Sequence, residues 1–189
     1  MAEPADPFDL KEKIGLAAES TAGKTFGALM LAKREFVAAQ AESRAAPPFF
    51  FLDLERRLGE FLAPGRAFAE LWHERGGNVY MEKASTYVDA LRGYQLIHTL
   101  STQQARTCRP WIVIDSVTTL YKLCQHAVAA GIGIDLYQEA VKRAQSGKGF
   151  FAFEGSQWSQ VHTSMDAFLW PLLYTNPSNV LMLGHLKGL

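Results

Sequence analysis

The sequence predicts an α/β fold in which a mainly parallel β-sheet is covered by helices on both faces. Several short apolar runs show no alternation with polar residues, which is typical of strands that are buried on both faces. Longer segments with helical periodicity separate these runs, as they do in parallel sheets connected by helices. With 189 residues, 48% of them hydrophobic, the chain can bury the core of one such domain, and this composition excludes intrinsic disorder.

Each predicted strand is a short apolar run beside a turn signal. The clearest is Trp-Ile-Val-Ile at 111–114, which follows Pro110 and leads into Asp115-Ser116. Another is Phe-Phe-Phe-Leu-Asp-Leu at 49–54, which follows a proline pair. The five predicted strands are residues 13–18, 49–54, 78–81, 111–114 and 179–183.

The predicted helices carry apolar residues at three- and four-residue steps, as Phe26, Leu29, Met30, Lys33 and Val37 illustrate. Glycine or proline punctuates their ends, and Pro171 predicts a bend within the last helix. The predicted helices are residues 24–40, 66–74, 86–107, 118–130, 135–145 and 157–174, with a glycine- and phenylalanine-containing loop at 146–155.

The strongest chemical signal lies between the first predicted strand and the first predicted helix. Ala18-Glu19-Ser20-Thr21-Ala22-Gly23-Lys24-Thr25 fits the phosphate-loop pattern G-x-x-x-x-G-K-[ST] except at its first position, where alanine replaces glycine. In such a loop, backbone N–H groups and the start of a helix surround an anion. The predicted nucleotide-binding residues are Glu19, Ser20, Thr21, Ala22, Gly23, Lys24 and Thr25. Lys24 is expected to reach the β- and γ-phosphates and Thr25 to hold Mg²⁺.

Two acidic residues follow predicted strands, where ligands of parallel sheets bind. Asp115 is expected to support Mg²⁺, and its alternative role is that of a helix N-cap. Glu55 is expected to orient the attacking water, and its alternative is an ion pair with Arg56 or Arg57 on a solvated loop. Asp53 precedes Glu55 by two residues, so the two are expected to share one face of an extended segment.

Four stretches together resemble a RecA-type P-loop ATPase: residues 13–25, 49–55, 111–118 and 179–185. The resemblance implies ATP and Mg²⁺ as cofactors, with Asp115 on the metal side of the site. It implies catalytic roles for Lys24, for Glu55 as the residue that activates water, and for His185 as the sensor of the γ-phosphate. Residues 1–12 are then a flexible N-terminal tail, and residues 13–189 form a RecA-like nucleotide-binding domain that is short at its C-terminus.

The stretches are most similar to those of phage-encoded ATPases that assist single-strand annealing. This resemblance implies a role in phage or bacterial DNA recombination or replication. It also implies a homo-oligomer in which one subunit supplies a cationic finger to the next. The candidates for the finger are Arg56, Arg57, Arg106 and Arg109.

Lys142, Arg143 and Lys148 are the candidate contacts with single-stranded DNA, because aromatic residues follow them closely. Cations can meet phosphates while bases stack on rings such as Phe151 and Phe153. The alternative is that these rings pack into the core and the cations face solvent. The formal net charge of zero gives no whole-chain attraction to nucleic acid or to an anionic membrane.

The chain is expected to be cytoplasmic, in a bacterial or phage-infected cell, and not associated with membranes. It has two cysteines, Cys108 and Cys124, which are too few for a disulfide scaffold. The first residues do not form a signal peptide, and no apolar run approaches the ~20 residues of a membrane-spanning helix. Two alternatives to an ATPase stay open: a nucleotide-binding scaffold with weak catalysis, and a small-molecule kinase.

Overall fold

A computed structural model describes residues 12–18, 23–147 and 151–185 of the chain. Its centre is a five-stranded, all-parallel sheet in the order β1-β5-β4-β2-β3. The strands are β1 (Lys13–Ala18), β2 (Phe49–Asp53), β3 (Val79–Lys83), β4 (Trp111–Asp115) and β5 (Asn179–His185). All five predicted strands are present, and the predicted parallel α/β architecture is confirmed.

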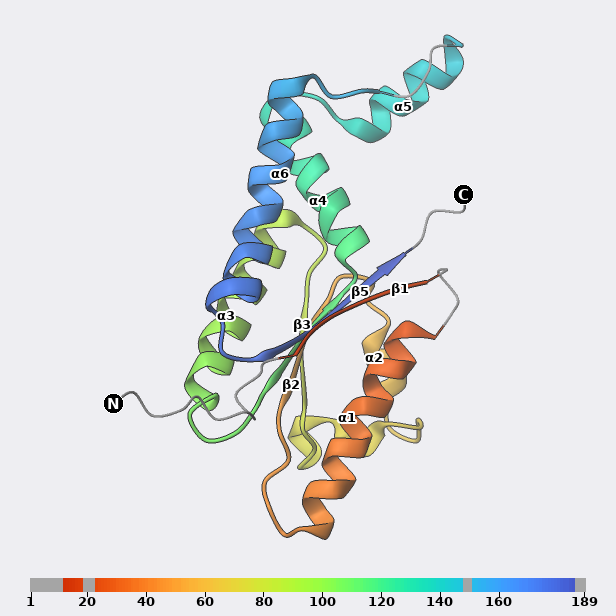
Figure 1. Cartoon of the computed structure of the whole chain (residues 1–189). Helices are drawn as coiled ribbons and strands as arrows, with labels where there is room; N and C mark the ends of the chain where they lie inside the picture. The colour runs from red at the N-terminus through yellow and green to blue at the C-terminus, as the bar shows by residue number, and fades with distance from the viewer. Residues whose placement is uncertain (1–11, 19–22, 148–150, 186–189) are drawn as a thin grey trace, which may run out of the picture.

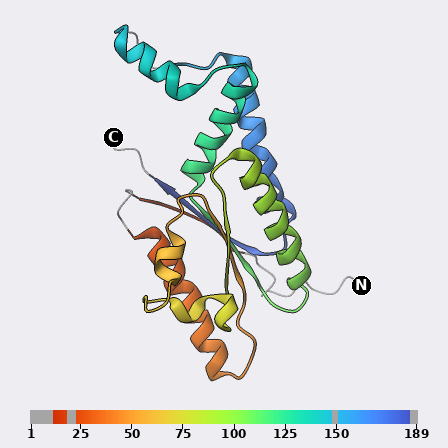
Figure 2. The same cartoon turned by 180° about the vertical axis from the view of Figure 1, so that it is seen from behind.

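Helices cover both faces of this sheet (Figures 1 and 2). One face carries α1 (Lys24–Ala41) and α2 (Leu58–Leu62). The other carries α3 (Tyr87–Gln104), α4 (Val117–Gly131) and α6 (Gly155–Trp170), and α6 continues into a π-helical turn at Pro171–Thr175. The remaining helix, α5 (Leu136–Gln145), lies at the outer end of α4 and α6, away from the sheet (Figure 1).

The lack of alternation in β2 and β4 follows from this layering, whereas β1, expected to be buried, lies at the sheet edge and is mostly exposed. All five residues of β2 are buried, with Phe50 and Leu52 facing the α3/α4/α6 layer and Phe49 and Phe51 facing the α1/α2 layer. Strand β4 is buried in the same way. Both faces of these strands therefore need apolar side chains, which removes the period-two pattern of a half-exposed sheet.

One predicted helix is wrong. Residues 66–74 form two 3₁₀ turns, at Ala69–Leu71 and His73–Arg75, and the α-helix of this region is α2, which precedes them. The apolar residues Phe68 and Leu71 sit three apart as in a helix, but each packs from a short turn into the core. Burial of these two side chains explains the periodicity without a continuous helix. Helix α6 begins at Gly155, two residues before its predicted start.

The order of the strands places the four predicted site segments at one edge. Because all strands run in the same direction, the carboxyl ends of β1, β5, β4 and β2 meet at one edge of the sheet. Ala18 is in register with His185, and Asp53 is in register with Asp115. Within the described residues, no helix is long and apolar enough to cross a membrane. Residues 1–11 of the predicted tail lie outside the described ranges.

Candidate nucleotide site

The first turn of α1 presents Lys24 at this edge. Gly23, its N-cap, has a left-handed backbone with φ of 73°, and a Cβ there would meet no atom within 4 Å. The left-handed angle is what favours glycine at this place in the motif. The Lys24 side chain is buried and its Nζ donates a 3.0 Å hydrogen bond to the Ala18 carbonyl oxygen. Residues Glu19, Ser20, Thr21 and Ala22 of the predicted loop lie outside the described residues.

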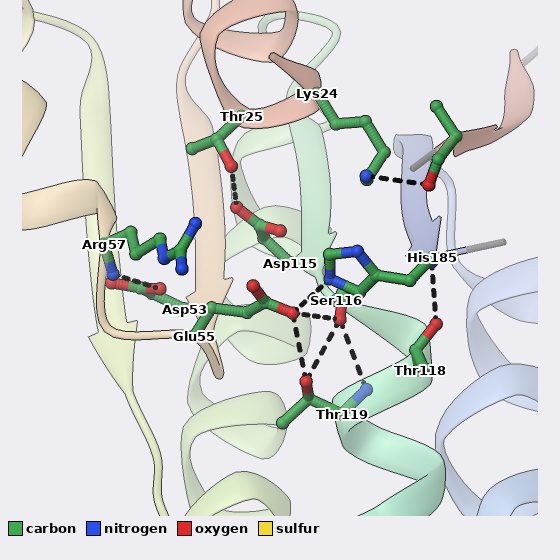
Figure 3. Close-up of polar contacts among 11 residues, drawn as sticks. Lys24, Thr25, Asp53, Glu55, Arg57, Asp115, Ser116, Thr118, Thr119 and His185 are labelled. Atoms are coloured by element: carbon green, nitrogen blue, oxygen red, sulfur yellow. Dashed lines mark hydrogen bonds and ion pairs between the residues drawn. The ribbon is translucent and has the colours of Figure 1, made fainter. Parts of the chain in front are cut away.

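Thr25 and Asp115 meet across the start of α1 and the end of β4, as Figure 3 shows. The Thr25 hydroxyl donates a 2.6 Å hydrogen bond to Asp115 Oδ2, and Asp115 is 2% exposed. Burial raises the pKa of Asp115, and the hydrogen bond from Thr25 offsets part of this, while the nearby carboxylate of Glu55 adds to it. The site therefore concentrates negative charge that a cation would relieve.

The donor set at this point fits Mg²⁺. A threonine hydroxyl and an aspartate carboxylate are hard oxygen ligands, and Mg²⁺ commonly takes only one or two protein ligands beside phosphate oxygens and water. The described residues contain no group of three or more His, Cys, Asp or Glu side chains able to hold a metal by themselves. Thr25 and Asp115 are the side chains that could hold Mg²⁺ together with phosphate oxygens and water.

Glu55 lies just beyond β2 and is held by groups from β5 and α4. Its Oε1 accepts hydrogen bonds from the Ser116 hydroxyl at 2.7 Å and the Thr119 hydroxyl at 3.1 Å, and lies 2.5 Å from His185 Nε2. Burial alone would raise the pKa of Glu55, but the hydrogen bonds from Ser116, His185 and Thr119 outweigh it and the pKa is lowered. Glu55 is therefore held in its ionised form, which the role of a proton acceptor requires.

Asp53 does not share a face with Glu55, contrary to the expectation from their spacing. The chain bends after β2, and the fully buried Asp53 carboxylate accepts the backbone N–H groups of Arg57 and Leu58 at 3.3 and 3.1 Å. Its pKa is raised because it is buried, although these backbone hydrogen bonds lower it in part. Asp53 thus shapes the loop that carries Glu55, whereas Glu55 faces α4 and β5.

One open cavity of about 140 Å³ lies at the start of α1. Its lining residues are Gly23, Lys24, Thr25, Phe26, Glu55, Arg57, Phe61, Asp115 and His185. Arg57, expected from the resemblance as one candidate for a finger in a neighbouring subunit, lies at the site of its own chain. Ser116 and Thr119 were missed as site residues, although their hydroxyls follow directly on the Asp115 strand end, a signal that the sequence carried.

The two described candidate DNA contacts, Lys142 and Arg143, lie on α5 and do not line this cavity. Arg143 pairs with Glu139 at 2.7 Å and lies 5.5 Å from the centre of the Phe151 ring. Phe153 is buried in the core and packs edge-on against Phe151. Lys142 is exposed, and Lys148 lies outside the described residues. The two described phenylalanines therefore follow the packing alternative, and Arg143 already has partners within the chain.

Comparisons with known proteins agree with the fold. No protein-family model matches the chain, and no curated protein sequence is similar to it. Among solved structures, it is similar to an ATPase from the type III secretion system of pathogenic bacteria, with a TM-score of 0.56 and 14% sequence identity. The match covers 94% of this chain and 45% of that ATPase, so the chain spans less than half of its length. This chain therefore shares its parallel α/β fold with part of that ATPase.

Proposed function

We propose that this chain binds Mg·ATP at the start of α1 and hydrolyses it. The observation that carries the proposal is the convergence of Lys24, Thr25, Asp115, Glu55 and His185 on one cavity, although they come from four separate segments of the chain. Bound there, Mg·ATP would supply a γ-phosphoryl group open to attack by water. Some residues of the site would bind the nucleotide, and others would orient the water and accept its proton.

Lys24 and Thr25 hold the nucleotide. Lys24 contributes a positive charge at the N-terminal end of an 18-residue helix, where the helix dipole also favours anions. The Thr25 hydroxyl and the Asp115 carboxylate are 2.6 Å apart and hold the Mg²⁺ that accompanies the phosphates. Neutralisation of the buried Asp115 charge by the ion also favours this binding.

Glu55 orients water and takes its proton, and His185 senses the phosphate. The lowered pKa of Glu55 keeps the carboxylate ionised at neutral pH. Figure 3 shows the His185 ring between Glu55 and Lys24. With Nε2 held by Glu55, the other nitrogen, Nδ1, is buried and has no hydrogen-bond partner within the described residues. In the imidazolium form, Nδ1 can donate a hydrogen bond to a phosphate oxygen.

We further propose that the ATPase acts in phage or bacterial DNA recombination or replication, as a homo-oligomer on single-stranded DNA. The support is the resemblance of residues 13–25, 49–55, 111–118 and 179–185 to ATPases with that role. In this proposal Lys142, Arg143 and Lys148 contact DNA phosphates, and Arg143 exchanges its pairing with Glu139 for a phosphate. The nucleotide site carries the primary proposal and does not depend on this second one.

The test is an ATPase assay of the purified chain with and without single-stranded DNA. Wild-type turnover, abolished in Lys24→Ala, is the expected result. The matched control is Lys33→Ala, which removes another lysine of α1 and should leave turnover unchanged. Lys33 pairs with Glu70 and lies over the Phe68 ring, and it does not line the cavity. ATP binding without turnover, with or without DNA, would support a nucleotide-binding scaffold instead. No binding of Mg·ATP in calorimetry would overturn the proposal.

A further inference from the structure

The first turn of α4 carries three hydroxyl side chains that reach to two different strand ends. Ser116 is the N-cap of α4, is fully buried, and accepts the backbone N–H of Thr119 at 3.2 Å while its own hydroxyl donates to Glu55. Thr119 Oγ1 also donates to Glu55. Thr118 Oγ1 accepts the backbone N–H of His185 at 2.8 Å. One helical turn thus contacts groups beyond β2 and at the end of β5.

We propose that Thr119, together with Ser116, is a positioning residue that fixes which oxygen of Glu55 faces the reaction. This inference rests on the proposed ATPase function. The hydroxyls hold Oε1 against α4, and this orientation leaves Oε2 on the side of Thr25 and Asp115. Oε2 is then the oxygen that receives the proton of the attacking water.

The hydrogen bonds to Glu55 are distributed unequally between its two oxygens. Ser116, Thr119 and His185 all approach Oε1, which uses the acceptor capacity of that atom. Within the described residues, Oε2 accepts no hydrogen bond. In Figure 3 the Glu55 oxygen without dashed lines points toward Asp115. The arrangement leaves the acceptor sites of this second oxygen available to a water molecule.

The backbone around Glu55 does not by itself explain this orientation. Glu55 lies in a bend two residues after the end of β2, and the next residue, Arg56, has a positive φ of 60°. A glutamate side chain in such a loop has several rotamers to choose from, and ordering it costs conformational entropy. The α4 hydroxyls supply the interactions that offset this cost, and they are carried on a regular helix anchored by the buried Ser116 cap.

The test uses Thr119→Val, which keeps the shape of the side chain and removes the hydroxyl, and Thr119→Ser, which keeps the hydroxyl. We expect Thr119→Val to lower kcat at least about tenfold, because a hydrogen bond to a charged group contributes at least that much. KM for ATP should change by less than about twofold, because Thr119 does not hold the nucleotide. Thr119→Ser should restore kcat to near the wild-type value.

A double-mutant cycle shows whether Thr119 acts through Glu55. In a Glu55→Ala background, measured by single turnover, adding Thr119→Val should cause no further loss. The positioning role would be overturned if Thr119→Val caused the same loss of kcat in that background. It would also be overturned if Thr119→Ser were as slow as Thr119→Val, or if Thr119→Val had the kcat of the wild type. If the wild-type chain itself does not hydrolyse ATP, the proposed function fails and this inference fails with it.

Discussion

The contact between Thr25 and Asp115 allows a sharp test of the site without any ligand. Thr25→Val keeps the branched shape of the side chain but removes the hydroxyl that lies 2.6 Å from Asp115 Oδ2. Asp115 is 2% exposed, so water does not readily replace the lost hydrogen bond. The nearby Glu55 and Asp53 carboxylates repel the Asp115 charge and offer it no compensation.

The magnitude follows from the kind of bond removed. A hydrogen bond to a charged group contributes about 1.5–3 kcal/mol, and leaving its buried partner unsatisfied costs a similar amount. We therefore expect the free energy of unfolding of the apo protein to fall by about 2 kcal/mol. For a chain of this size, each kcal/mol shifts Tm by about 2–4 °C, so Tm should fall by about 4–8 °C.

Thermal unfolding without and with Mg·ATP measures both the stability of the apo protein and its stabilisation by the ligand. The Thr25→Ser control keeps the hydroxyl and should lose no more than about 1 kcal/mol, since it removes only one methyl group. Mg·ATP at 100 times its Kd should stabilise the wild type by about 2.7 kcal/mol. Thr25→Val should show no such gain. An apo Tm equal to that of the wild type, or an equal gain with Mg·ATP, would refute the reasoning.

Three further predictions concern catalysis, pH and packing. Glu55→Gln should bind Mg·ATP as tightly as the wild type, while kcat falls at least about 100-fold, because the proton acceptor is lost; equal kcat values would exclude Glu55 as the base. Because the pKa of Glu55 is lowered from its ordinary value of 4.5, the ionised side chain stabilises the fold at pH values above 4.5. This stabilisation is lost as the pH falls below 4.5. Denaturant titrations should therefore show a stability difference between the wild type and Glu55→Gln that shrinks below pH 4.5, and a constant difference would contradict it. Gly77→Ala should lower the free energy of unfolding by at least about 3 kcal/mol, because the added Cβ would overlap the Leu71 backbone. The control Gly15→Ala should be tolerated, because its Cβ would meet nothing within 4 Å. Equal Tm values for the two variants would contradict this prediction.

The strands and most of the helices were predictable from the sequence, because their signals are local. A strand buried on both faces needs an unbroken apolar run, and β2 and β4 have one. The region after β2 was not predictable in the same way. There the spacing of Phe68 and Leu71 imitates a helix, but the segment is buried by contacts with α1 and α2. The periodicity of apolar residues predicts which side chains are buried, but it does not predict which elements they pack against.

The Gly23-Lys24-Thr25 segment and the two acids after strand ends could also be picked out from the sequence as site candidates, since each belongs to a short motif. Only the tertiary structure decided which groups meet at the site. Placement of β5 between β1 and β4 brings His185 to Glu55, 130 residues away along the chain. The contacts of Ser116 and Thr119 with Glu55 likewise depend on the direction in which α4 continues from the end of β4. Such contacts depend on the order of strands and on packing between distant segments, which no local pattern of residues encodes.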